Sequence, residues 1–247
     1  MFRALFLALV LACSTAFAQD GIETGSDIWN WSPEKEYHKA IVQIETDLGF
    51  GCGTVIKTEP KDDKHDVAYI VSAAHVFMNM FDTEPKTLGK LVYYDGTKIK
   101  NCSVIQFDRQ NDVVLVYGLC PKGLKPVTVA KQDAKPKDKL EFCGLGGKSD
   151  VLKNGVRHFF GVATETTSAD RIVVSTYVIH GDSGGAVLNE AGELVGVISG
   201  GLSLCSREIT HDSGWKKIIV FPSLACNANH VNKLLEKQFN PVKPASE

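Results

Sequence analysis

The pattern that most constrains the fold is a series of short apolar stretches broken by turn residues. The first series predicts strands at 39–46, 50–58, 66–73, 90–95, 99–107 and 112–118, and the second at 127–130, 138–145, 156–167, 171–178, 184–189, 193–201 and 216–222. Asp95-Gly96 between two of these stretches is typical of a β-hairpin. No long segment between them has a helical period, so the pattern favours an all-β sandwich or pair of barrels over βαβ units.

A polar stretch at 130–139, with lysines and prolines, divides the two series and predicts a solvated linker between two lobes. One helix is expected at 229–237, because Val231, Leu234 and Leu235 share one face, with Asn227 or Asn229 as its cap. These boundaries predict one domain over 39–247, with a first lobe at 39–125, a second at 136–225 and a helix at 227–238. A chain of 247 residues is long enough to bury such a core.

The first residues have the composition of a targeting segment. A positive start precedes the apolar run 4–12, and small residues before Gln19 predict a signal peptide over 1–18. The run is too short to span a bilayer of about 30 Å, so we expect a secreted or periplasmic protein with no membrane association after cleavage. A lipidated Cys13 is the alternative. Residues 19–38 are interpreted as a lead-in that covers part of the domain.

Charge and cysteine content narrow the function classes. A formal net charge of −2 does not indicate a basic surface, so nucleic acid is not an expected partner. If Cys13 leaves with the signal peptide, six cysteines remain, and an even count in an exported chain favours disulfides: Cys52, Cys102, Cys120, Cys143, Cys205 and Cys226. None of them forms a C-x-x-C pair, so no metal and no organic cofactor is expected.

The segment 181–185, Gly-Asp-Ser-Gly-Gly, has the composition of a nucleophile turn. A nucleophilic serine must present its Oγ to substrate and leave backbone N–H groups free to face a developing oxyanion. Gly181 permits the unusual backbone angles that such a turn needs. Ser183 is therefore a candidate nucleophile, with a plain glycine-rich loop as the alternative.

His75 and Asp112 are the candidate partners of this serine. His75 follows two alanines at the end of an apolar strand, and Asp112 opens another apolar strand, with Asp108 as the competing carboxylate. Taken singly, such residues are more often surface, turn or cap residues. A serine hydroxyl needs an adjacent base, however, and that base needs a carboxylate to fix its tautomer.

The chain order His75, Asp112, Ser183 in these contexts resembles the chymotrypsin/trypsin-like serine peptidase superfamily, over nearly the whole mature chain. The resemblance implies two six-stranded antiparallel β-barrels packed side by side with a short C-terminal helix. His75 and Asp112 would come from the first barrel and Ser183 from the second.

The resemblance also implies roles. Ser183 attacks a peptide carbonyl, His75 transfers the proton, Asp112 orients His75, and the N–H groups of Gly181 and Ser183 form the oxyanion hole. The substrate is then a protein or peptide, hydrolysed through an acyl-enzyme.

Substrate-binding positions follow from the same resemblance. Tyr177 stands at the base of the specificity pocket with Val178 beside it, and Ser199, Gly200 and Gly201 would pair with the substrate backbone. A pocket without a buried carboxylate cannot pair a Lys or Arg side chain, so we expect poor cleavage after basic residues.

The chain departs from the digestive members of this superfamily. It lacks their Ile-Val-Gly-Gly start, so Asp182 needs another partner and no zymogen switch of that kind is expected. This resembles the bacterial-type branch that includes the HtrA proteases, with no chain left for their PDZ module.

Val76 follows His75, so the disulfide that the superfamily forms beside its histidine is absent. Spacing suggests three other cysteine pairs: Cys102–Cys120, Cys205–Cys226 and Cys52–Cys143.

Two other functions stay open. A binding protein on the same fold would have lost catalysis, although such proteins usually lack one of the three residues. An esterase would use the same chemistry, but its usual serine turn leads from a strand into a helix, and its histidine follows the serine.

Overall fold

The structure, a computed structural model of the chain, describes residues 35–79, 82–85, 89–145, 157–166, 171–176, 178–210 and 216–240. The predicted signal peptide, Cys13, most of the lead-in and Tyr177 lie outside these ranges. No helix within them is both long and apolar enough to cross a membrane.

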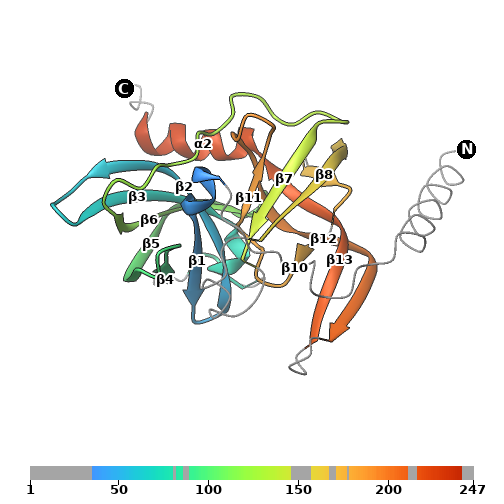
Figure 1. Cartoon of the computed structure of the whole chain (residues 1–247), viewed down its shortest axis with the longest axis horizontal. Helices are drawn as coiled ribbons and strands as arrows, with labels where there is room; N and C mark the ends of the chain where they lie inside the picture. Colours follow the sequence, from blue (N-terminus) through green and yellow to red (C-terminus); the bar gives the residue numbers. More distant parts are fainter. Residues whose placement is uncertain are drawn as a thin grey trace, which may run out of the picture. The chain divides into compact units, whose positions relative to one another are not determined.

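The first six strands close into an antiparallel barrel in the order β1-β2-β3-β6-β5-β4 (Figure 1). Their bounds are β1 Ile41–Thr46, β2 Gly49–Pro60, β3 His65–Ser72, β4 Gly89–Val92, β5 Lys98–Asp108 and β6 Val113–Pro121. β3 is buried from its second residue to its last, and the first four residues of β6 are buried as well. Ile70 and Leu115 are fully buried there, each contributing about 1.5–3 kcal/mol by leaving water.

The remaining strands form a second barrel. They are β7 Lys139–Gly144, β8 Arg157–Thr166, β9 Arg171–Val174, β10 Val178–Ile179, β11 Ala186–Leu188, β12 Leu194–Thr210 and β13 Lys216–Asn227. The sheet runs β10-β13-β12-β11-β7-β8-β9, and the additional pairing of β13 with β9 closes six strands into a ring to which β10 is added. The prediction of two six-stranded antiparallel barrels with a C-terminal helix is confirmed.

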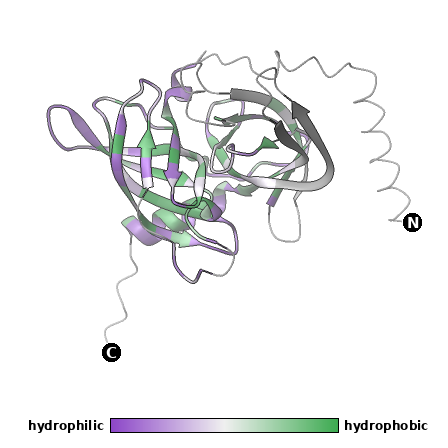
Figure 2. Cartoon of the chain, turned by 90° about the horizontal axis from the view of Figure 1, so that it is seen from below, coloured by the Kyte–Doolittle hydropathy of each residue, from purple (hydrophilic) through white to green (hydrophobic). Residues whose placement is uncertain are grey.

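Hydrophobic residues lie mainly on the strands, which also carry hydrophilic ones, and the loops are mainly hydrophilic (Figure 2). The larger of two hydrophobic cores fills the first barrel and also takes in second-barrel residues such as Leu145, Leu188 and Val197. The smaller core lies within the second barrel around Phe142, Val187 and Ile198. The larger core is therefore shared between the two barrels.

Several predicted strands differ from the structure, and two of them are longer than predicted: the strand expected at 193–201 extends to Thr210, and the one expected at 216–222 extends to Asn227. Residues 127–130 contribute only an isolated parallel bridge, from Val129 to Leu194, because their backbone groups bond to two different strands: Val127 donates to the carbonyl of Val55 in β2, and the bonds of Thr128 and Ala130 go to Leu194 in β12. The stretch 171–178 divides into β9 and β10, with a bend at 175–176. The first strand begins at Ile41, since Glu36–Ala40 forms the 3₁₀ helix η2.

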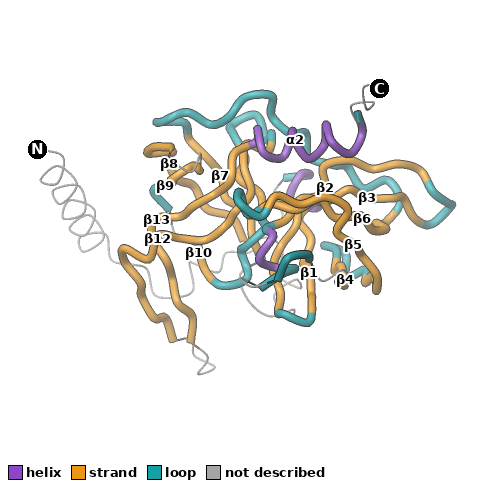
Figure 3. Tube along the Cα trace, turned by 180° about the vertical axis from the view of Figure 1, so that it is seen from behind, coloured by secondary structure: helices purple, strands orange, loops and turns teal. Residues whose placement is uncertain are grey.

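The C-terminal helix α2, Ala228–Phe239, lies along the segment that connects the barrels (Figures 1 and 3). Asn227 occupies the N-cap position but makes no capping hydrogen bond with its side chain. The backbone N–H of Asn229 instead donates to Asp133 Oδ1 at 2.8 Å, and Asn232 Nδ2 donates to the carbonyl of Ala130 at 2.9 Å. The prediction of an asparagine cap is wrong, because the connecting segment supplies the carboxylate.

The predicted disulfides are absent from the described residues. Cys52, Cys102, Cys120, Cys143 and Cys226 are buried thiols that belong to no disulfide. Cys102 packs against Gly118 rather than Cys120, and Cys226 pairs in register with Val197 while Cys205 pairs with Phe221. The thiol of Cys52 donates to the carbonyl of Gly181 at 2.9 Å and its sulfur accepts the N–H of Leu145 at 3.2 Å, so it is hydrogen-bonded to the Ser183 turn and to the residue that follows β7.

Candidate active site

His75 is held in a short 3₁₀ turn, η3, Ala74–Val76, directly after β3. Its neighbours Ala74 and Val76 are buried and pin the turn to the core, while the His75 side chain remains 46% exposed. Small alanines before the histidine allow the backbone to turn against the barrel, so the ring projects outward.

Asp112 lies in the turn between β5 and β6 and binds His75 twice. Its Oδ1 accepts the backbone N–H of His75 at 2.9 Å, and its Oδ2 lies 2.8 Å from His75 Nδ1. The Asp112 carbonyl also accepts the N–H of Ala74 at 3.2 Å. Asp112 has a left-handed φ of 56°, and Asp108, its competitor, bonds to Asn111 within the same turn. Asp112 is thus the carboxylate that meets the imidazole.

Charge on Asp112 is favoured by its surroundings. Burial alone would raise the pKa of this carboxyl, but the hydrogen bonds and charge of His75 and the hydrogen bond from Ser199 outweigh burial and lower its pKa below the ordinary value. Ser199 Oγ donates to Asp112 Oδ2 at 2.5 Å. The carboxylate is therefore kept ionised and is oriented by donors from both barrels.

Ser183 lies in a tight turn between β10 and β11. Gly181 and Gly184 have left-handed φ values of 98° and 87°, a region that glycine enters without a Cβ penalty. A Cβ on Gly184 would collide with the carbonyl oxygen of Cys52 and lie 3.0 Å from the N atom of Ala73. The N–H of Cys52 donates to the Ser183 carbonyl at 2.6 Å. The turn is thus packed directly against the segments that carry His75.

The backbone N–H groups of this turn fall into two sets. Those of Asp182, Gly184 and Gly185 donate to carbonyls within the protein. Across the described ranges, those of Gly181 and Ser183 donate to no protein acceptor. The two predicted oxyanion donors are the ones that the fold leaves unused. Over the same ranges, the His75 ring bonds Asp112 and does not bond Ser183, which leaves Nε2 as its available nitrogen.

Asp182, expected to need a partner, is fully buried beside the serine. Its Oδ2 accepts the backbone N–H of Ile179 at 2.9 Å, and a Cβ on Gly144 would collide with the same carboxylate. Asp182 therefore stabilises the turn from inside.

The predicted substrate-binding residues lie around β10 and β12. Val178 is buried and pairs with Val220. Gly200 and Gly201 pair with Leu224 and Ser223 of β13. Pairing of β12 with β11 ends at Val197, so among the described strands the other edge of 199–201 has no partner, and a Cβ on Gly200 would meet open space. Tyr177 lies outside the described residues.

A cluster of three buried residues has side chains of the kinds that bind metal ions. The ligand atoms of His38, Glu141 and Cys143 lie within 4.8 Å of one another. Glu141 already bonds His38 Nε2 at 2.8 Å, the Tyr37 hydroxyl at 2.7 Å and Lys35 Nζ at 3.0 Å. A lysine ammonium beside the carboxylate opposes a second cation, so these contacts fasten the N-terminal segment to β7.

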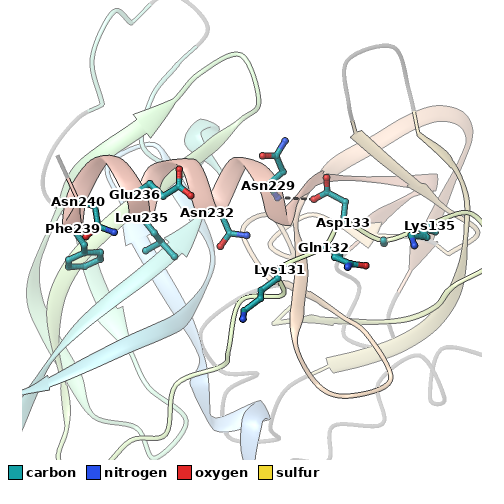
Figure 4. Close-up of a pocket in the computed structure, with 11 residues that line it drawn as sticks. Lys131, Gln132, Asp133, Lys135, Asn229, Asn232, Leu235, Glu236, Phe239 and Asn240 are labelled. Atoms are coloured by element: carbon teal, nitrogen blue, oxygen red, sulfur yellow. Dashed lines mark hydrogen bonds between the residues drawn. The ribbon is translucent and has the colours of Figure 1, made fainter. Parts of the chain in front are cut away.

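A groove of about 950 Å³ lies elsewhere, between the connecting segment and α2 (Figure 4). Its lining mixes charged and amide side chains such as Lys131, Asn232 and Glu236 with apolar ones such as Leu235 and Phe239. None of the predicted site residues lines it.

The sequence did not indicate two contacts of the site. The hydroxyl of Ser199 reaches Asp112, and Arg171 Nη1 donates to that hydroxyl at 2.8 Å. These pairs are 87 and 28 residues apart in the chain, and no local motif marks either one.

Comparison with known proteins agrees with this geometry. The structure is similar to the Rv3671c protease in its inactive form, with 18% identity and a TM-score of 0.55 over 81% of this chain and 89% of that chain. It is also similar to the serine endoprotease from Yersinia pestis, with 15% identity and a TM-score of 0.57 over 85% of this chain and 68% of that chain. At these identities the likeness shows the fold.

No curated protein matches the sequence. The trypsin-like peptidase domain family matches residues 51–197, which carry His75, Asp112 and Ser183 within the two barrels. With more than half of the chain matched and the fold in agreement, the chain belongs to the trypsin-like peptidase domain family.

Proposed function

We propose that this protein is a secreted serine endopeptidase that uses His75, Asp112 and Ser183. The observation that carries the proposal is the doubly bonded His75–Asp112 pair, beside a glycine turn whose Gly181 and Ser183 N–H groups are unused. Family membership and the protease neighbours support a hydrolase.

The chemistry follows from this arrangement. Asp112 accepts a hydrogen bond from the Nδ1–H of His75, which leaves Nε2 to take the Ser183 proton as the hydroxyl attacks the peptide carbonyl. The oxyanion receives hydrogen bonds from Gly181 and Ser183, and such donors lower the barrier by about 3–4 kcal/mol each. His75 returns the proton to the leaving amine, and water then hydrolyses the acyl-enzyme.

Substrate would bind as a strand along residues 199–201, whose free edge supports this pairing. Val178 presents no charge to a basic side chain, and Tyr177 in the sequence presents none either. We therefore propose a preference for small or apolar residues before the cleaved bond. A substrate-library profile dominated by Arg or Lys would contradict it.

A fluorophosphonate probe followed by a protein-digestion assay tests the function. We expect covalent labelling and proteolysis in the wild type, the loss of both in Ser183→Ala, and retention of both in Ser103→Ala, a serine of β5. Absence of labelling in the wild type would favour a binding protein. Labelling without proteolysis would favour an esterase.

A further inference from the structure

Arg171, a residue outside the predicted site, bridges the two barrels beside Asp112. It opens β9 in the second barrel, and its Nη1 donates to Ser199 Oγ at 2.8 Å. Its Nη2 donates to the backbone carbonyl of Gln110 at 3.2 Å. Gln110 lies in the first-barrel turn that carries Asp112, so one guanidinium holds both the serine that bonds Asp112 and the turn that presents it.

The sheet register explains how Arg171 reaches Ser199. Arg171 pairs with Cys226 of β13, and Cys226 pairs with Val197 of β12. Ser199 follows Val197 by two residues on the same strand. The side chain therefore extends across β13 toward the edge of the first barrel, and closure of the second barrel through β13 and β9 is what places it there.

The contacts fix the direction of the Ser199 hydroxyl. A guanidinium carries only donors, and it is charged at every working pH. Ser199 must then accept from Arg171 and direct its single proton to Asp112 Oδ2, which is the oxygen that also faces His75 Nδ1. Without Arg171 that hydroxyl could rotate, and the Gln110 carbonyl would lose its tie to the second barrel.

We propose that Arg171 is a positioning residue, acting through Ser199 and the Gln110 carbonyl to hold Asp112 in the orientation that fixes His75. The inference rests on the proposed function, since it assigns the residue that aligns that machinery. Arg171 touches neither His75 nor Ser183 in the contacts described above, so its effect on the reaction is indirect.

The first experiment compares Arg171→Met, Arg171→Lys and Arg109→Met by fluorophosphonate labelling and peptide hydrolysis. Misalignment of a catalytic group by about 1 Å costs on the order of 10²-fold in rate. We expect a loss of that size in kcat for Arg171→Met, with a smaller change in KM. Arg171→Lys should recover part of the lost kcat, because an ammonium can donate to Ser199 but does not reproduce the two hydrogen bonds that the guanidinium makes to Ser199 and the Gln110 carbonyl. Arg109, which donates to the Asp82 carbonyl, is the matched control and should behave as wild type.

A double-mutant cycle tests whether Arg171 acts through the Ser199 hydroxyl. Since Arg171 acts mainly through the hydroxyl, adding Arg171→Met to Ser199→Ala should reduce the rate by less than about threefold further. Full additivity, or a wild-type rate in Arg171→Met while its unfolding free energy is unchanged, would overturn the proposal.

A spectroscopic measurement does not depend on activity. The proton shared by His75 Nδ1 and Asp112 should give a downfield NMR resonance in the wild type, Arg171→Lys and Arg109→Met, and that resonance should broaden or vanish in Arg171→Met. An unchanged resonance in Arg171→Met would refute the positioning role. If the wild type neither labels nor hydrolyses peptides, the proposed function fails, and this resonance still decides the role of Arg171.

Discussion

Asp133 Oδ1 accepts the backbone N–H of Asn229 at 2.8 Å, so the segment between the barrels caps the C-terminal helix (Figure 4). Replacing a capping carboxylate by alanine typically costs about 1 kcal/mol. We expect Asp133→Ala to lower the free energy of unfolding by that amount in urea titration, and Asp133→Asn to retain most of it. Gln132→Ala is the neighbouring control, and an equal loss there would exclude a capping effect.

The Gly184 turn should not tolerate a side chain. A left-handed φ costs an L-residue about 1–2 kcal/mol, and at Gly184 a Cβ would in addition collide with the Cys52 carbonyl. We predict that Gly184→Ala lowers stability by about 3 kcal/mol or more and abolishes fluorophosphonate labelling. Gly123 has a φ of 77° with open space around it, so Gly123→Ala should show the backbone cost alone. Equal losses at the two glycines would contradict the packing argument.

The contacts of Glu141 predict a large stability effect at a distance from the triad. Removing one member of a buried, hydrogen-bonded charge cluster typically costs about 3–5 kcal/mol. Glu141→Ala should approach that loss in denaturant titration, because His38 beside it is fully buried. Glu36, paired with Lys39 at the surface, is the control, and its alanine variant should unfold like the wild type. Comparable unfolding of the two variants would show that the cluster contributes little.

Asp112 links stability to pH. Its folded-state pKa is lowered, so its contribution is complete above the ordinary aspartate value of about 3.9 and is lost as the pH falls through the lower folded value. Asp112→Asn should remove this part of the acid dependence of unfolding free energy, and Ser199→Ala should reduce it. In activity assays, Asp112→Asn should lower kcat by about 10⁴-fold. If the unfolding free energy of Asp112→Asn depended on pH as that of the wild type does, the role given to Asp112 would be contradicted. Ser103→Ala is the control and should leave both this pH dependence and kcat unchanged.

The buried thiols should be inert in the folded protein. Burial raises the pKa of Cys102 and Cys226 to about 12, so almost no thiolate is present near neutral pH. We expect little alkylation by iodoacetamide under native conditions and, after denaturation without reductant, complete alkylation of Cys52, Cys102, Cys120, Cys143 and Cys226. Masses that show residues linked in pairs would restore the disulfide prediction.

Sequence patterns were sufficient for the fold because strand alternation and turn residues are local signals. They predicted an all-β chain in two lobes and the C-terminal helix, whereas the two six-stranded barrels were implied by the resemblance to the trypsin-like superfamily. They did not predict how β13 closes the second barrel against β9, because that pairing joins Arg171 to Cys226 and depends on the assembled sheet.

The residues of the site also fall into those that the local sequence indicates and those that it does not. His75, Asp112 and Ser183 stand in recognisable local contexts, and the Asp112–His75 bond agrees with the choice of Asp112 over Asp108. Arg171 and the Ser199 hydroxyl had no such context, since each depends on a contact between segments distant in the chain. The cysteine pairs failed because spacing alone does not determine which side chains face each other.

Because the larger core is shared by the two barrels, it affects molecules in which only one barrel has folded. A molecule in which only the first barrel has folded exposes apolar surface that the second would cover, and it lacks Ser183 of the proposed triad. The unfolded barrel of such a molecule could bind as an extended substrate to a fully folded copy, while the incomplete molecule has no complete triad of its own. Under the proposed function, completed molecules would therefore cleave incompletely folded copies of the same chain.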